Sequence, residues 1–219
     1  MHGLRVLVGS DDFRSTILFL ILVNAFAMGL EATPDAFALY ATQLGWVFLI
    51  SQTAFVAEIA LRCWAAPAGQ FFKDSWNRFD FAVVALSLLP AVGEFALVAR
   101  IFRVLRVVRI VSVGEVLWGS VLAKDGRLPA VLLTPLLLLL SGYVFALSGF
   151  HLFGESMPEW SSLARSVEML LHSLTLTGFV AAWKAGGGLL IFHELFYLSL
   201  ISIGVNLGVS LLRQSRSEP

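Results

Sequence analysis

Charged side chains are scarce in this sequence: they make up 14% of its 219 residues and balance to a formal net charge of zero. Soluble domains are about a quarter charged, so the composition excludes a water-soluble domain as the main part of the chain. The absence of a basic excess argues against nucleic-acid binding, and we expect no nucleic-acid partner. Cys63 is the only cysteine, which excludes an intrachain disulfide.

Apolar residues, by contrast, make up 58% of the chain and are gathered in long blocks. A bilayer core of about 30 Å is crossed by about 20 helical residues. The segment at 159–173 is too short and too polar to span and predicts a re-entrant helix. The fold class expected is an all-α membrane protein in a lipid bilayer. Six spans are predicted, at residues 13–32, 43–65, 79–92, 95–113, 128–150 and 189–212.

The lysines and arginines outside the spans predict the orientation of the chain, because they concentrate on the cytoplasmic side. Six spans place both ends on one side, and the other side holds only Arg165 and Lys184. We therefore expect a multi-pass protein of the cell (plasma) membrane with both termini cytoplasmic. The residues on the side of the termini are Arg5, Arg14, Arg62, Lys73, Arg78, Lys124, Arg127, Arg213 and Arg216.

The fourth predicted span carries an arginine at every third position, with only apolar residues between them: Arg100, Arg103, Arg106 and Arg109. Each arginine at the bilayer centre costs about 2.5–3.5 kcal/mol, and each charge crossing the membrane field gains about 2.3 kcal/mol per 100 mV. Because three helical residues rise about 4.5 Å, sliding the helix by one step moves each arginine to its neighbour's place. The stripe predicts gating charges. The alternative, a basic surface helix, would carry polar residues between the arginines.

Two acids in neighbouring spans are the predicted partners of these arginines. The second span enters from outside and the third starts from inside, so Glu58 and Asp80 both lie in the inner half and can hold one arginine between them. Phe55, one turn outward of Glu58, is predicted to be an apolar plug that confines the electric field. The local alternatives are a pair between Glu58 and Arg62 four residues on, and Asp80 as an acid at a helix N-terminus.

Several stretches of this sequence resemble the bacterial voltage-gated sodium channel family. They are residues 23–31 (VNAFAMGLE), 55–62 (FVAEIALR), 71–81 (FFKDSWNRFDF) and the arginine repeat, followed by the shorter matches Pro158-Glu159-Trp160, Thr175-Leu176 and Val205-Asn206-Leu207. The resemblance implies a four-helix voltage-sensor bundle at residues 1–113 and a pore domain of two helices with a re-entrant pore helix at 128–213. An amphipathic linker at 114–127 and a tail at 214–219 complete the chain.

The resemblance also implies that Phe55, Glu58 and Asp80 form a charge-transfer centre and that the protein is a homotetramer around a central pore. The residues support a tetramer independently. Two pore spans and one re-entrant helix cannot enclose a channel, whereas symmetric closure repeats each filter residue around an axis.

The predicted selectivity filter is Thr175, Leu176, Thr177, Gly178 and Phe179. The family continues from Thr-Leu into Glu-Ser-Trp, whereas here Thr177 stands in place of the acid and no carboxylate ring forms. We expect carbonyl and hydroxyl groups of residues 175–177 to contact the ion, and a sodium-channel-like pathway for monovalent cations, with Na⁺ favoured and weak selectivity. The alternative is a pore that does not conduct, or one that admits anions past Lys184.

Asn206 lies where the family has its inner-helix asparagine, and we expect it to hydrogen-bond across helices at an inner gate. Gly204 and Gly208 flank it and predict either a hinge or close helix packing. Nothing in the sequence indicates an enzyme: His193-Glu194 lacks the second histidine of a zinc-binding helix, and the remaining histidines are widely separated. We expect no catalytic residue, no metal and no cofactor.

Overall fold

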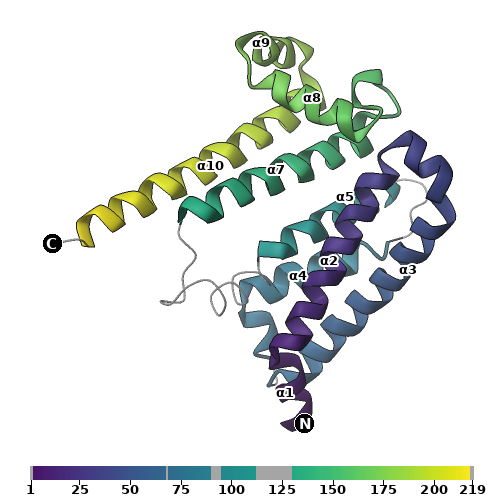
Figure 1. Ribbon diagram of the computed structural model, residues 1–219, viewed down its shortest axis with the longest axis vertical. Coiled ribbons are helices and arrows are strands. Elements are labelled where there is room, and N and C mark those ends of the chain that lie inside the picture. The colour runs from purple at the N-terminus through teal and green to yellow at the C-terminus, as the bar shows by residue number, and fades with distance from the viewer. Residues whose placement is uncertain (1, 68, 90–94, 112–129, 218–219) are drawn as a thin grey trace. The chain divides into compact units, whose positions relative to one another are not determined.

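The computed structural model describes residues 2–67, 69–89, 95–111 and 130–217, and across these ranges the secondary structure is helical, without a strand. The chain divides into two compact units, Met1–Val121 and Leu122–Pro219. Figure 1 shows the helices of both units. The expected all-α membrane fold is confirmed, since four described helices are long and apolar enough to cross a membrane: Asp11–Glu31, Pro34–Ala65, Thr134–Phe153 and Gly187–Ser210.

The first unit is a bundle in which α2 packs against α3, and α4 packs against both α3 and α5. Its core includes Ile17, Ile21, Phe55, Ile59 and Val84, so the helices that carry Glu58 and Asp80 are held by packing beside those acids. The elements are α1 (His2–Gly9), α2 (Asp11–Glu31), α3 (Pro34–Ala65), the 3₁₀ helix η1 (Phe71–Lys73), α4 (Ser75–Leu86), α5 (Phe95–Leu105) and the 3₁₀ helix η2 (Arg106–Val108).

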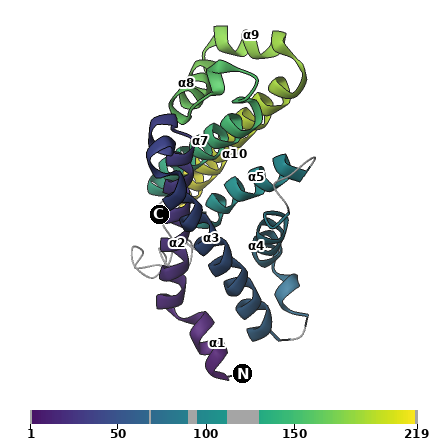
Figure 2. The same ribbon diagram turned by 90° about the vertical axis from the view of Figure 1, so that its right-hand side faces the viewer.

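In the second unit α7 and α10 lie side by side, and α8 and α9 cover one end of the pair (Figures 1 and 2). The hydroxyls of Ser141 and Ser199 meet at 2.8 Å between the two long helices. Trp160 is buried against α7, with its ring where a side chain at Gly149 would lie. The elements are α7 (Ala130–Phe153), the 3₁₀ helix η3 (Pro158–Trp160), α8 (Leu163–Ser173), α9 (Leu176–Ala185) and α10 (Gly187–Ser217).

The predicted spans differ from the observed helices mainly at their ends. The second begins at Pro34, because proline is favoured at the first position of a helix. The third begins at Ser75, because the Asp74 carboxylate caps the backbone N–H groups of Trp76 and Asn77. Helix α1 was not predicted from the sequence. The predicted linker at 114–127 lies outside the described residues.

Candidate functional site

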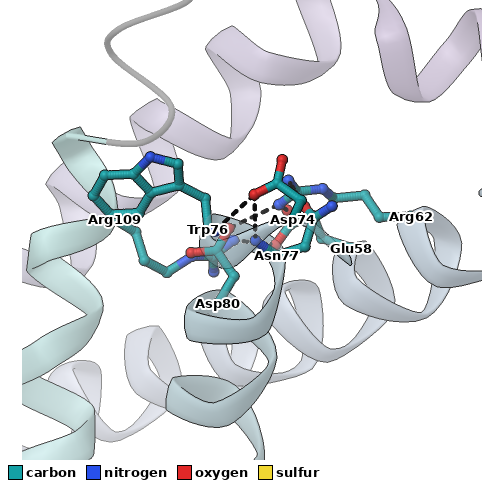
Figure 3. A network of polar contacts seen from close by, with 7 residues as sticks. All are labelled: Glu58, Arg62, Asp74, Trp76, Asn77, Asp80 and Arg109. Carbon is teal, nitrogen blue, oxygen red and sulfur yellow. Dashed lines mark hydrogen bonds and ion pairs between the residues drawn. The ribbon is translucent and has the colours of Figure 1, made fainter. Parts of the chain in front are cut away.

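The last arginine of the stripe lies between the two predicted acids (Figure 3). Arg109 donates from Nη2 to Glu58 Oε2 at 2.5 Å and from Nε to Asp80 Oδ1 at 3.0 Å. All three residues are buried, with at most 3% of their surface exposed. The structure therefore brings together side chains from three segments that lie far apart in the sequence, and Arg109 lies between Glu58 and Asp80.

A second arginine binds the same two carboxylates through their other oxygens. Arg62 Nη1 lies 2.9 Å from Glu58 Oε1 and 2.9 Å from Asp80 Oδ2, and its Nη2 donates to Asn77 Oδ1 at 2.7 Å. Two acids and two arginines thus form one neutral cluster, in which each carboxylate is shared. The sequence offered two partners for Glu58, the nearby Arg62 or an arginine of the stripe, and in the structure Glu58 binds both Arg62 and Arg109. The sequence reasoning missed the bond from Arg62 to Asp80.

Asp80 is not an acid at a helix N-terminus, which was the local alternative. Helix α4 begins at Ser75, and its capping acid is Asp74. Asp80 lies in the second turn and points into the bundle, where it is 1% exposed. Because a buried carboxylate needs charged or hydrogen-bonding partners, its position is explained by Arg109 and Arg62 and not by the helix dipole.

The Phe55 ring contacts two successive arginines of the stripe. Its centroid lies 5.2 Å from Cζ of Arg109 and 5.7 Å from Cζ of Arg106, within the range of cation–π attraction. The ring is fully buried. Phe55 therefore contacts the arginine bound by the acids and also the next arginine along the helix.

The backbone of the stripe changes from α-helix to 3₁₀ helix at Arg106–Val108. In a 3₁₀ helix residues three apart lie on one face, and Arg106 and Arg109 are both buried and both contact the Phe55 ring. Arg106 donates to the side-chain oxygen of Gln52, and Arg103 lies over the Phe48 ring, with Cζ 5.6 Å from its centroid. These two α3 partners were not found from the sequence, because neither carries a charge.

The predicted filter begins at the junction of two helices in the second unit. Thr175 caps α9: its hydroxyl donates to His172 O at 2.7 Å and accepts from Gly178 N at 3.1 Å, and Thr177 Oγ1 lies 3.0 Å away. Helix α9 starts at Leu176, so the rest of the predicted filter, to Phe179, lies in its first turns. The Thr175 carbonyl accepts from Phe179 N at 2.9 Å. The Thr175 carbonyl therefore has one lone pair engaged by the helix and one left, and its expected contact with an ion stays a prediction.

Gly178 permits the close approach of α9 to the end of α8. A side chain there would collide with the backbone of His172 and Ser173. Tyr197 on α10 donates its hydroxyl to Ser173 O at 2.7 Å and so holds the same end of α8. The junction is thus fixed by one glycine and one tyrosine, neither of which the sequence singled out as a fixing contact.

Asn206 donates to Ser202 O of its own helix at 2.9 Å. In the described chain the exposed amide thus binds the carbonyl one turn earlier on α10, and the expected hydrogen bond across helices stays a prediction. A side chain at Gly204 or Gly208 would meet nothing within 4 Å in the described chain, so neither glycine packs closely against a described neighbour. Across the described residues, no three histidine, cysteine or acidic side chains are grouped so that they could hold a metal ion.

Comparisons with known proteins indicate the family of the chain. A family model described as ion transport protein matches residues 11–212. The solved structure of NaChBac in a lipid nanodisc is 31% identical, with 98% of each chain covered and a TM-score of 0.50. A cation channel sperm-associated protein 2 of Mus musculus is 38% identical over 89 residues, or 37% of this chain. A sodium channel protein of Electrophorus electricus is 28% identical over 160 residues, or 68% of this chain. The chain spans only 14% and 8% of the lengths of these two relatives.

Proposed function

The chain belongs to the ion transport protein family, and we propose that it is a voltage-gated channel subunit whose arginine stripe moves with the membrane potential. The observation that carries the proposal is Arg109, bound by Glu58 and Asp80 at 2.5 and 3.0 Å beside the Phe55 ring. Charged residues within a membrane face the bundle interior and pair with one another, and they mark functional paths.

The contacts of the stripe suggest how it moves. A helix step of about 4.5 Å replaces Arg109 at the acids by Arg106, which already contacts the Phe55 ring. Arg100 and Arg103 follow at the same spacing. Because the acids are never left without a mobile arginine at the end of a step, the helix has a small number of discrete stable positions. Because Arg109 is the innermost arginine of the stripe and lies at the acids, the proposal assigns this arrangement to the outward, activated position.

For the second unit we propose a cation pathway formed by four copies, lined at Thr175–Phe179 and narrowing near Asn206. The likeness to NaChBac over the whole chain supports this assignment. The hydroxyls of Thr175 and Thr177 supply neutral oxygens, and no carboxylate lies between Thr175 and Phe179. Because cation channels use rings of acidic side chains to attract cations, a filter without them is expected to pass monovalent cations such as Na⁺ with weak selectivity.

A second candidate is a voltage-sensing protein whose pore does not conduct or selects differently. The observation in its favour is the helical course of the chain from Leu176, which uses the Thr175 carbonyl in a hydrogen bond. An ion filter can use carbonyl oxygens to replace the hydration water of the ion, and here the Thr175 carbonyl also accepts a hydrogen bond from Phe179 N.

The test is voltage clamp of the full chain, in which displacement current and ionic current are recorded together. The proposal expects displacement current on depolarisation, followed by cation current. Displacement current without ionic current supports the second candidate, and the absence of both contradicts voltage sensing.

The filter assignment is tested with Thr177→Glu. A ring of four acids attracts divalent cations, so the reversal potential in a calcium gradient is expected to move towards that of calcium. Glu159→Gln, which changes a charge outside Thr175–Phe179, is the control for general surface charge. An unchanged reversal potential in Thr177→Glu contradicts the placement of the filter.

A further inference from the structure

A cavity of about 510 Å³ lies within the first unit, among α1, α2, the end of α3 and the η1–α4 segment. Three arginines from three helices line it: Arg5, Arg14 and Arg62. Phe13, Phe71 and Trp76 supply part of its apolar wall. The proposed voltage-sensing cluster uses only one member of this set, Arg62.

The arginines differ in how many donors they have already committed. Arg62 uses both terminal nitrogens on Glu58, Asp80 and Asn77. Arg5 uses only Nε, which donates to Ala65 O at 2.9 Å. Among the described residues the nearest acid to Arg14 is the exposed Asp11, at 3.7 Å, beyond hydrogen-bond distance. Arg5 and Arg14 therefore bring guanidinium donors to the cavity that the fold has not used.

Two acids also line the cavity, and the fold uses both. Glu58 is bound by Arg62 and Arg109. Asp74 accepts with Oδ1 from the backbone of Trp76 and Asn77 at the start of α4. Because the Glu58–Asp80 cluster is neutral as a whole, the charges of Arg5 and Arg14 exceed the single charge of Asp74. The cavity therefore has a positive balance.

The surface next to the cavity has the composition of a membrane interface. Helix α1 exposes Val6 and Leu7, which are 61% and 52% exposed, beside Arg5, in the manner of a short helix lying in the interface plane. Trp64 is 70% exposed at the end of α3 and Trp76 is 40% exposed at the start of α4. Tryptophan is enriched at the level of lipid headgroups, so lipid is the anion source within reach.

We propose that this cavity binds a phosphate-bearing anion, the headgroup of an anionic phospholipid from the leaflet that it faces. Guanidinium groups bind phosphate oxygens in pairs and with charge-assisted hydrogen bonds. Arg5 and Arg14 make the direct contacts, and the apolar wall with Trp76 accommodates the glycerol end of the lipid.

A regulatory consequence follows, and it rests on the proposed function. Arg62 lines the cavity and shares both acids with Arg109. A negative headgroup there attracts the mobile arginines as they step past the acids towards it. The bound lipid therefore stabilises the inward position of the stripe, and activation requires a more positive potential when the cavity is filled.

Binding is tested with no voltage applied, on the full chain in nanodiscs of phosphatidylcholine. The probe is dioctanoyl phosphatidic acid, and bound lipid is counted by native mass spectrometry. Arg5→Gln with Arg14→Gln is expected to weaken binding at least about tenfold, because two charge-assisted contacts are lost. Arg78→Gln, an exposed arginine of the same end that does not line the cavity, is expected to bind like the parent chain.

The single variant Arg14→Gln keeps the bond from Arg5 to Ala65 O. It therefore tests the same site even if the double variant unfolds α1. The site is overturned if both arginine variants bind the lipid as tightly as the parent chain does. It is also overturned if Arg78→Gln loses as much binding as they do. Inorganic phosphate separates the sources of the anion: weak competition supports a lipid, and competition at the lipid's own concentration overturns the lipid assignment.

The regulatory step is tested by displacement current with phosphatidic acid present. A shift of the displacement curve to positive potentials that is absent in Arg14→Gln supports this step. No shift while the lipid is bound overturns this step alone.

Discussion

The first unit joins its helices through buried charges, whereas hydroxyl groups and backbone carbonyls make key contacts between helices of the second. In the first, Arg109 and Arg62 share Glu58 and Asp80. In the second, Ser141 meets Ser199, and Tyr197 donates to the backbone of Ser173. Shared carboxylates allow one arginine to replace another without changing the shape of the site. The contacts of Ser141 with Ser199 and of Tyr197 with Ser173 involve no charged group that a second arginine could replace. The difference suits a moving element in the first unit and a fixed one in the second.

The strongest test of this contrast removes one shared charge. In Asp80→Asn both arginines lose a partner, and breaking a buried ion pair from one side costs about 3–5 kcal/mol. We expect a large fall in the thermal stability of the first unit and a displaced charge–voltage curve, measured in nanodiscs and under voltage clamp.

Asp74→Asn is the matched control for that variant. It removes an exposed acid from the start of the same helix, and asparagine still caps a helix well. Equal effects of the two substitutions would mean that the buried cluster is no more important than a surface charge.

The fixed geometry of the second unit is tested at the α8–α9 junction. Gly178→Ala forces a methyl group against the backbone of His172, and overpacking of this kind costs about 1–3 kcal/mol. We expect lower thermal stability and loss of ionic current while displacement current from the first unit persists. Loss of both currents together would show that the two units do not separate in this way.

Phe55 tests how much Arg106 and Arg109 gain from the ring that both contact. Phe55→Leu keeps an apolar plug but removes attraction to Arg106 and Arg109, which is worth about 0.5–2 kcal/mol at each site. We expect the charge–voltage curve to shift, and Phe55→Trp to preserve or strengthen the outward position. Identical curves for leucine and tryptophan would assign the ring a purely steric role.

The smallest effect is expected at Gly204, on the exposed face of α10. A methyl group there meets nothing within 4 Å in the described chain, and glycine in a helix is less stable than alanine by about 0.5–1 kcal/mol. Gly204→Ala should therefore raise thermal stability slightly. A marked loss of stability would instead point to close packing against another copy of the chain.

The sequence predicted the membrane class correctly, and the recognition of a sodium-channel-like chain is confirmed by the family match and by the likeness to NaChBac. It also predicted that Glu58 and Asp80 lie at one depth, because the chain direction of two successive spans fixes depth. Their role as a charge-transfer centre remains a prediction. The helical course of residues 176–179 was missed, because the cap that starts α9 is the same Thr175 that was assigned to the filter.

The sequence by itself determined the apolar helices, the three-residue spacing of the arginines and the absence of an acid at residue 177, since these depend on residues close together in the chain. Only the tertiary structure decided which arginine lies at the acids, that Arg62 shares both of them, and that Gln52 binds Arg106. The reason is physical: spacing along a helix fixes its face, but the register between two helices is set by packing, and a shift of one step exchanges every partner.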